Sequence, residues 1–283
     1  MLLPGDQRFW RRLRRSRSAW IGAALVGLCL GCALFAPLLA PYGPHEKDGA
    51  SPLAPPSAAH WLGTSPDGYD VLSRVIYGSR LSLLAGVVSI GLAVLVGVSV
   101  GIAAGYFGGW ADALLMRSID LVLSFPGILV AILVVLASDR TSWTPIMVAV
   151  GIINIPIFAR QVRATVLTVR SLDYVVASEA MGARPRHVLW HVILPSVVSP
   201  VIVLATLGVG TAVLEVAGLS FLGIAGQPDD PEWGTMLAVA KNFLAASFWP
   251  ALAPGVAISL TVLGFNLLGD GLRDALDPRL HLR

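Results

Sequence analysis

The sequence has little charge. Only 13% of its 283 residues are Asp, Glu, Lys or Arg, whereas a soluble domain carries about a quarter. Hydrophobic residues make up 55%, and the mean hydropathy is +0.76. This balance excludes a soluble globular protein. The 29 glycines and 19 prolines suit membrane helices, which tolerate both residues better than soluble helices do.

Lysine is nearly absent. Two of the 20 basic residues are lysine, and neither Lys47 nor Lys241 is followed by the Ser or Thr of a Walker A loop, G-x4-G-K-[ST]. ATP must therefore be bound by a partner, and no cofactor is expected in the chain itself. No basic stretch is interleaved with aromatic side chains, so nucleic acid is not an expected partner.

Reactive side chains are scarce too. Cys29 and Cys32 form a C-x-x-C pair inside the first apolar stretch, and we interpret them as packing residues instead of metal or redox ligands. His187 and His191 are spaced i,i+4 but lack a third ligand nearby, which makes a metal site the weaker alternative. No Ser/His/Asp, Cys/His or paired-carboxylate arrangement indicates catalysis. We expect neither catalytic residues nor a metal site.

Six intervals are long and uncharged enough for membrane helices, which need about 20 apolar residues. They cover 19–41, part of 81–111, 121–138 with an extension back through Arg117, 141–159, a stretch from about 192 past Glu215, and part of 242–269. The first interval is longer than the apolar region of a cleaved secretory signal, which favours an uncleaved anchor.

Basic residues set the expected orientation. The segments on the side of the N-terminus carry fourteen arginines, and the opposite segments carry five basic residues, namely Lys47, Arg74, Arg80, Arg140 and Lys241. Because Lys and Arg near helix ends stay in the cytoplasm, both termini are expected to be cytoplasmic. Residues 42–80 would then face outward as a linker with turns, and residues 226–246 would face outward as well.

The stretch 160–191 between the fourth and fifth spans is too long for a minimal turn and too amphipathic for a disordered linker. Residues 173–181 are predicted to form a short helix, with Asp173 as its N-cap and Gly182 as its C-terminal glycine. A second helix should then enter the membrane, with Pro195 near its start.

This stretch resembles the cytoplasmic EAA loop of permease subunits of bacterial ABC importers, whose motif reads E-A-A-x3-G-x9-I-x-L-P. The motif positions are occupied by Ala177, Ser178, Gly182, Val192, Leu194 and Pro195. Val176 stands where the motif has glutamate, which puts an ion pair from that position in question. Other stretches resemble C-type subunits of the dipeptide, oligopeptide and nickel importer class: 60–64, 70–74, 105–109, Phe125-Pro126, 219–223, Trp233-Gly234 and 265–278. Tyr69 departs from the arginine usual there.

The resemblance implies an all-α membrane protein with six transmembrane helices and the type I ABC importer permease fold. A cytoplasmic tail, first span and extracytoplasmic linker would occupy 1–75, and a five-helix permease domain would occupy 76–283. It further implies a coupling helix that docks on an ATPase through Ala177, Ser178, Glu179, Met181, Gly182 and Ala183. The implied partners are a homologous permease subunit, two ATPase subunits and an extracytoplasmic binding protein, in the lipid of the bacterial inner membrane.

Polar residues inside the spans are candidates for the pathway or its gate, because they are costly at membrane depth. Arg117 and Asp120 are expected to pair with one another, with a gate role as the alternative. Glu215 is the best candidate for contact with a cationic group of a substrate, against a role in helix packing. Asn266 is expected to fix helix packing near the cytoplasmic exit.

The substrate stays open at this point. The resemblance favours short peptides, with nickel or a metallophore complex as the alternative, because residues 175–178 and 216–220 look closer to nickel-type subunits. Another small solute is the third option. A secondary transporter driven by an ion gradient is the alternative from another class, and it leaves the coupling loop unexplained. A membrane-embedded enzyme would need reactive residues that the chain lacks.

Overall fold

The computed structural model describes residues 7–47, 49, 51–138, 142–224, 226–227 and 229–276, and helices dominate this part of the chain. Five helices are long and apolar enough to cross a membrane, or six if one bent pair counts as a span. The single helices are α2 (Arg17–Leu34), α4 (Val71–Phe107), α7 (Thr144–Arg170), the continuous helix Pro185–Phe221 that ends in α10 (Leu194–Phe221), and α12 (Trp249–Leu276). The prediction of an all-α membrane protein is confirmed for the described residues, which contain five or six candidate spans.

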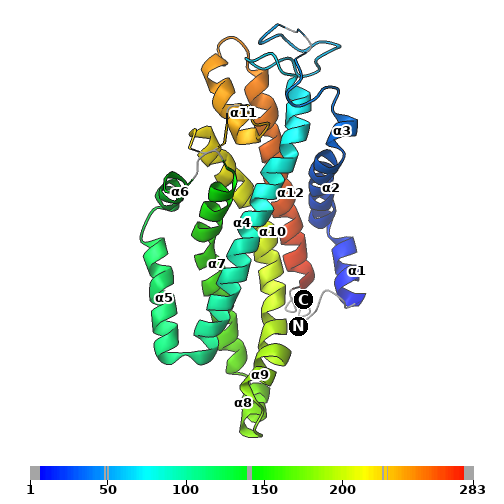
Figure 1. The fold of residues 1–283 in the computed structure, drawn as a ribbon. Helices are drawn as coiled ribbons and strands as arrows, with labels where there is room; N and C mark the ends of the chain where they lie inside the picture. The colour runs from blue at the N-terminus through cyan, green and yellow to red at the C-terminus, as the bar shows by residue number, and fades with distance from the viewer. Residues whose placement is uncertain are drawn as a thin grey trace.

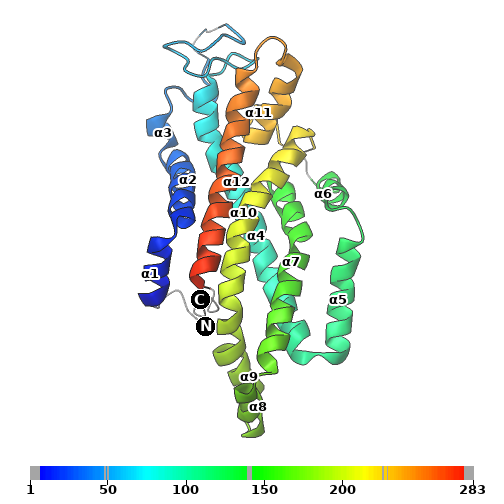
Figure 2. The ribbon, with the colours of Figure 1, turned by 180° about the vertical axis from the view of Figure 1, so that it is seen from behind.

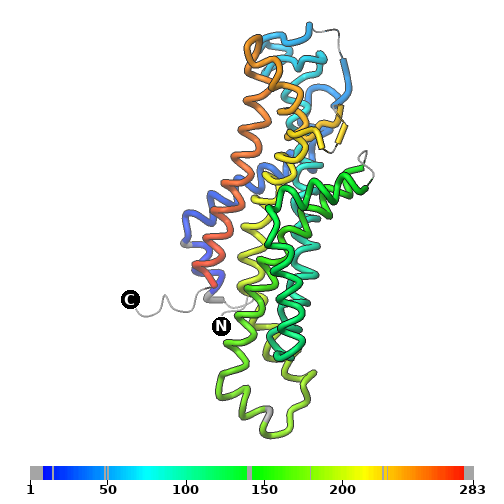
Figure 3. The backbone as a smooth tube through the Cα atoms, turned by 90° about the vertical axis from the view of Figure 1, so that its left-hand side faces the viewer, coloured from blue at the N-terminus to red at the C-terminus, as the bar shows by residue number. Residues whose placement is uncertain are grey.

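The long helices run side by side along one axis (Figure 1). Seen from behind, α10 crosses between α12 and α7 (Figure 2). One end of the bundle carries the linker, the short helix α3 (Ala36–Leu39) and α11 (Trp233–Ala240). The opposite end carries α8 (Asp173–Ala180) and α9 (Pro185–Val188), which project beyond the other helices (Figure 3). Helix α1 (Gln7–Arg15) and the last turn of α12 lie in the half nearer to that end.

Helices α4 and α7 approach closely along a row of glycines on α4. A Cβ added at Gly97 would lie 2.6 Å from the Phe158 Cβ, and one added at Gly101 would lie 2.6 Å from the Ala159 carbonyl oxygen. Small residues four apart allow membrane helices to pack backbone to backbone, which compensates for the weak hydrophobic drive between helices in lipid. This contact holds α7, and with it the loop that follows, against the centre of the bundle.

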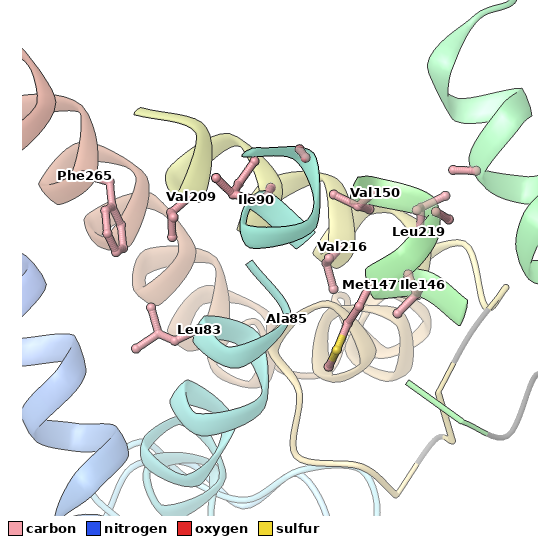
Figure 4. Packing of buried hydrophobic residues seen from close by; sticks show 14 of the residues in the cluster. Leu83, Ala85, Ile90, Ile146, Met147, Val150, Val209, Val216, Leu219 and Phe265 are labelled. Atoms are coloured by element: carbon pink, nitrogen blue, oxygen red, sulfur yellow. The ribbon is translucent and has the colours of Figure 1, made fainter. Parts of the chain in front are cut away.

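The hydrophobic core lies where α4, α7 and α10 meet. Its buried members include Ile90 of α4, Val150 of α7 and Val216 of α10, with Phe265 of α12 at its edge (Figure 4). A polar group inside this core is paired, since the Ser89 hydroxyl donates a hydrogen bond of 2.9 Å to the Met147 carbonyl. The three helices therefore form one packed unit.

Helix α4 begins at Val71, well before the predicted start near residue 81. The Asp70 carboxylate caps it by accepting a hydrogen bond of 2.7 Å from the Ser73 amide. Arg74 and Arg80, which were expected to lie in the linker, are instead part of this helix. Both find backbone acceptors, since Arg80 donates to the Ala33 carbonyl at 2.6 Å and Arg74 to the Asp229 carbonyl at 3.0 Å.

The predicted third span, 121–138, was wrong as a single helix. The chain forms α5 (Gly109–Leu123) and α6 (Gly127–Leu136), and these are bent by 88° at the break. Pro126 explains the break, because proline lacks an N–H and disfavours helical geometry at the preceding residue, Phe125. Helix α5 also starts earlier than predicted, at Gly109, directly after α4.

Other helix boundaries also differ from the predicted ones. The first predicted span, 19–41, is divided at Phe35 into α2 and α3, and α7 extends past the predicted end at 159 to Arg170. Helix α12 likewise continues beyond 269 to Leu276. Helix α11, within the outward segment 226–246, was not predicted at all.

Candidate functional site

The loop at the tip of the bundle is a compact helical turn. Helix α8 begins at Asp173 itself, so that the carboxylate lies in the first turn, where the helix dipole favours it. Gly182 has φ +85°, and the Ala183 amide donates a hydrogen bond of 3.1 Å back to the Ser178 carbonyl. This is the bond pattern of a Schellman ending, which favours glycine at the left-handed position. The predicted role of Gly182 as the C-terminal glycine is confirmed.

One side chain anchors α8 to the spans. Val175 is fully buried in a cluster that includes Val166 of α7, Val188 of α9 and Ile193. The short helix is thus joined through packing to both neighbouring spans, and not only through the chain. Packing therefore connects α8 to the ends of α7 and α10.

The outer surface of this loop exposes three large apolar side chains. The exposed fractions are 57% for Tyr174, 54% for Val176 and 83% for Met181. Among the predicted docking residues, Ala177, Met181 and Gly182 are exposed, and Ser178 and Ala183 are half-buried. The side chain of Glu179 lies outside the described part of the structure.

The helix that leaves the loop contains one wide turn. Leu189–Ile193 form a π-helical turn, in which the Leu194 amide donates to the Leu189 carbonyl. Pro195 follows directly and has no amide hydrogen to donate to the carbonyl one turn before it. The wide turn accommodates the proline without ending the helix, so Pro185–Phe221 remains continuous.

Deeper in the bundle, Glu215 of α10 meets Asn154 of α7. The Asn154 Nδ2 donates to Glu215 Oε2 at 2.8 Å and to the Val150 carbonyl at 2.9 Å. Asn154 is buried, with 4% exposure, and Glu215 is half-buried. Asn154 was not among the residues predicted from the sequence, although an amide in an otherwise apolar span is the signal that identifies it.

The predicted pair between Arg117 and Asp120 was wrong. Asp120 of α5 instead pairs with Arg160 of α7 at 2.6 Å, because α5 lies beside α7 and presents Asp120 to it. Both side chains are about half exposed, at 51% and 55%. Within the described residues, Arg117 has no ion pair.

A second ion pair joins the same two helices. Arg163 donates from Nε and Nη2 to the two carboxylate oxygens of Asp112, at 2.6 Å each. Such a bidentate arrangement fixes the orientation of both side chains. The side of the bundle formed by α5 and α7 therefore carries two charge pairs, neither of which sequence spacing predicted.

The opposite end of the bundle is closed by buried polar contacts that the sequence analysis also missed. Arg74, with 4% exposure, donates to the carbonyls of Asp229 and Asp230 at 3.0 and 3.2 Å. Glu232 is fully buried and accepts hydrogen bonds from the Ser82 hydroxyl and the Thr235 amide. These contacts tie the start of α4 to α11 and to the loop before it.

The remaining candidate residues lie outside the contacts described above. Asn266 is half-buried on α12, which packs against α2 and α10. The His187 and His191 rings stack 4.3 Å apart. Cys29 lies 3.2 Å from the Thr261 hydroxyl, between α2 and α12. In the described residues, no three His, Cys, Asp or Glu side chains are placed to hold a metal ion.

Two family models match the chain. The one described as "binding-protein-dependent transport system inner membrane component" matches residues 97–282. The other, the N-terminal TM domain of oligopeptide transport permease C, matches residues 6–56. Between them lies the stretch 57–96, which neither model matches.

Several curated proteins are similar over nearly the whole chain. The dipeptide transport system permease protein DppC of Alkalihalophilus pseudofirmus is 42% identical over 271 residues, which cover 96% of this chain and 89% of that protein. The glutathione transport system permease protein GsiD of Pectobacterium atrosepticum is 43% identical over 273 residues, covering 96% and 90%. The di/tripeptide transport system permease protein DppC of Pseudomonas aeruginosa is 41% identical over 278 residues, covering 96% and 91%.

A solved structure shares the fold. A crystal structure of an amino acid ABC transporter with histidines superposes with a TM-score of 0.56 and 14% sequence identity. The superposition covers 70% of this chain and 92% of the other.

Proposed function

The chain belongs to the family of binding-protein-dependent transport system inner membrane components, and we propose on this basis that it is the C-type permease subunit of an ATP-driven importer of short peptides. The observation that carries the proposal is the helical loop at the tip of the bundle. Its Gly182 ending and its buried Val175 fit a rigid element that transmits force, and its exposed apolar side chains fit a docking surface.

The proposed occupant of that surface is an ATPase subunit. Tyr174, Val176 and Met181 expose three large apolar side chains outside the long helices, where water would otherwise solvate them. Since Val176 replaces the motif's glutamate, the contact in this subunit would rely on apolar burial at that position instead of an ion pair. Two ATPases, one for each permease subunit, complete the proposed assembly.

The proposed partner permease would face the part of the bundle that contains α5, α7 and α10. The pair between Asp120 and Arg160 is half exposed, and Glu215 is half-buried. Charged side chains that face hydrocarbon are penalised by several kcal/mol, so this side is better suited to a water-filled pathway or a protein partner than to lipid. The chain thus contributes one wall of the proposed pathway.

The proposed orientation places both termini in the cytoplasm, with the linker and α11 outside. Helix α1 and the end of α12 lie in the half of the bundle that ends in α8 and α9 (Figure 1). The excess of arginine in the same segments supports this orientation. An extracytoplasmic binding protein would then meet the end that Arg74 and Glu232 close.

The proposed transport step is a rigid-body motion. ATP binding would draw the two ATPases together and displace α8. Because Val175 packs against both neighbouring spans, the displacement would reach α7 and α10 and open the pathway outward. Hydrolysis by the ATPases would reset it, so the chain itself performs no chemistry.

Peptides are favoured as the substrate over nickel. The relatives described above are named for dipeptides, di/tripeptides and glutathione, which are all short peptides. A substrate of this class carries a cationic amino group, a carboxylate and peptide groups. Glu215 is the residue proposed to meet the amino group.

The test is uptake by proteoliposomes that contain this chain, its partner permease, the two ATPases and the binding protein. We expect ATP-dependent uptake of a labelled dipeptide and none of a nickel chelate, with complexes that lack the ATPases as the control. ATP-dependent uptake of nickel alone would overturn the substrate proposal. Uptake by the purified chain in response to a proton gradient, without ATPases, would overturn the importer proposal itself.

A further inference from the structure

The amino-terminal helices carry a cluster of basic residues. The stretch 7–34 contains no Asp or Glu and carries arginines at positions 8, 11, 12, 14, 15 and 17. Arg11, Arg14 and Arg17 are exposed, and none of the three forms an ion pair with a described residue. These cations require either water or an external anion.

Helix α1 does not trail freely from the bundle. Phe9 is buried, with 4% exposure, among Val203 of α10 and the last turn of α12, and Leu13 packs against the same cluster. Ser16 separates α1 from α2 and caps α2 by accepting a hydrogen bond from the Ala19 amide. The basic residues are therefore held at a fixed elbow beside a membrane span.

An apolar groove of about 290 Å³ lies inside this elbow, between α1, α2 and α12. It is lined by Trp10, Leu13, Arg14, Trp20, Ala23 and Leu268. The two indoles are exposed, at 52% for Trp10 and 61% for Trp20. The Trp20 Nε1 donates a hydrogen bond of 3.1 Å to the Arg14 carbonyl, which fixes Trp20 at the elbow next to the arginine.

We propose that this groove is a binding site for an anionic phospholipid. The acyl chain would lie along Trp20, Ala23 and Leu268, and the phosphate would meet Arg14, with Arg11 one turn before it. Exposed tryptophans mark the boundary between hydrocarbon and headgroups, and a basic helix at that boundary attracts anionic lipid. An apolar slot with a cation at its mouth matches the two parts of such a lipid, whereas a soluble anion would have no use for the slot.

The site does not depend on which substrate the chain transports or on which ATPase it binds. It uses a different end of the chain from the loop at α8. A lipid seated here would hold α1 against α12, because the groove contains residues from both helices. Removal of the lipid should therefore loosen the packing of Phe9.

The test is a titration of the purified full-length chain, with and without its partner permease, in neutral detergent, read by native mass spectrometry. The probes are phosphatidylglycerol and phosphatidylcholine with identical acyl chains. We expect binding of phosphatidylglycerol at least about tenfold tighter than that of phosphatidylcholine. The double variant Arg11→Gln/Arg14→Gln should weaken phosphatidylglycerol about thirty-fold, since each arginine near an anionic lipid surface contributes about 1 kcal/mol. Arg184→Gln/Arg186→Gln, which removes two exposed arginines from the loop at α8, should bind like the wild type.

A second variant separates the groove from the charge. Ala23→Trp fills the slot and keeps every arginine, and it should abolish tight phosphatidylglycerol binding. In vesicles, phosphatidylglycerol with brominated acyl chains should quench the fluorescence of the wild type more than that of Trp20→Phe.

Three outcomes would overturn the proposal. The first is equal phosphatidylglycerol affinity in the wild type and in both groove variants. The second is competition by inorganic phosphate together with wild-type lipid binding in Ala23→Trp, which would make the arginines a site for free anions. The third is loss of binding whenever the partner permease is attached, which would make the groove a protein interface.

Discussion

The Asn154 amide of α7 donates a hydrogen bond of 2.8 Å to the Glu215 carboxylate of α10. The same amide group also donates to the Val150 carbonyl, so Asn154 is held firmly within its own helix. Glu215 is therefore both a tether between two spans and a half-buried carboxylate. These two roles can be separated by substitution.

Glu215→Gln should reduce peptide uptake at least about tenfold while the amount of assembled complex stays the same. Glutamine keeps the size and the acceptor for Asn154 but loses the charge proposed to meet the substrate amino group, and a hydrogen bond to a charged group is worth about 1.5–3 kcal/mol. Glu215→Leu should also lower assembly, because it leaves one of the two N–H groups of the Asn154 amide without an acceptor. The measurement is uptake divided by assembled complex for both variants. Normal uptake in Glu215→Gln would mean that Glu215 only links the two helices and does not recognise the substrate amino group.

Gly182→Asp should lower uptake at least about tenfold and weaken copurification of the ATPases without preventing membrane insertion. No atom lies within 4 Å of an added Cβ, so the variant meets no clash. The cost comes from the positive φ, about 1–3 kcal/mol for a residue other than glycine, and from a carboxylate at a helix C-terminus. Gly182→Asn is the matched control, because asparagine has the same shape, adopts this φ more readily and carries no charge. Wild-type uptake in Gly182→Asp would contradict the role of this turn.

Arg160→Gln and Asp120→Asn should act on one interaction. We expect their effects on the thermal stability of the purified complex to be non-additive, with a coupling of about 0.2–1 kcal/mol, as exposed pairs give. Arg117→Gln is the control, because Arg117 and Asp120 do not pair in the structure. Additive effects for the first pair and coupling for the second would restore the pairing that sequence spacing suggested.

Gly101→Ala should destabilise the chain by about 1–3 kcal/mol, measured by unfolding in detergent. Its Cβ would lie 2.6 Å from the Ala159 carbonyl oxygen and 2.8 Å from the Val162 Cβ, so that α4 and α7 would have to separate. Gly91→Ala on the same helix is the matched control, since no atom lies within 4 Å of its added Cβ. Equal stability of the two variants would mean that the close approach contributes little.

Single cysteines should report the orientation. In a background without Cys29 and Cys32, Ser57→Cys in the linker and Asn242→Cys beyond α11 should react with an impermeant thiol reagent in intact cells. Ser178→Cys in α8 should react only after the membrane is opened. Labelling of position 178 in intact cells would invert the proposed topology.

The loop at the tip was predictable because its signals are local. Gly182 ends α8 through its own backbone conformation, and the spacing to Pro195 is read directly along the chain. The boundaries of α4 were not predictable in the same way. Arg74 and Arg80 argue against a membrane helix until their acceptors are known, and those acceptors are carbonyls of distant segments.

The contacts between neighbouring helices were not predicted, for the same reason. Spacing on one helix suggested that Asp120 would pair with Arg117, but the position of α5 beside α7 supplied Arg160 as a nearer partner. Asn154 was overlooked because its meaning depends on Glu215, which is 61 residues away along the chain. Sequence reasoning thus located the apolar stretches and the loop, whereas the helix boundaries and the polar contacts between helices required the fold.

The wide turn Leu189–Ile193 also fixes an angle. Each residue of an α-helix advances the direction of the side chains by about 100°, and a π turn holds one residue more than a regular turn. Converting that turn to regular α-helix without removing a residue would rotate the loop by up to about that angle relative to everything after it. The hydrogen bond between Glu215 and Asn154 and the burial of Val175 in its cluster could then no longer form at the same time. The wide turn thus sets the rotation of the loop, which would receive force from the ATPase, relative to the spans, which would move in response.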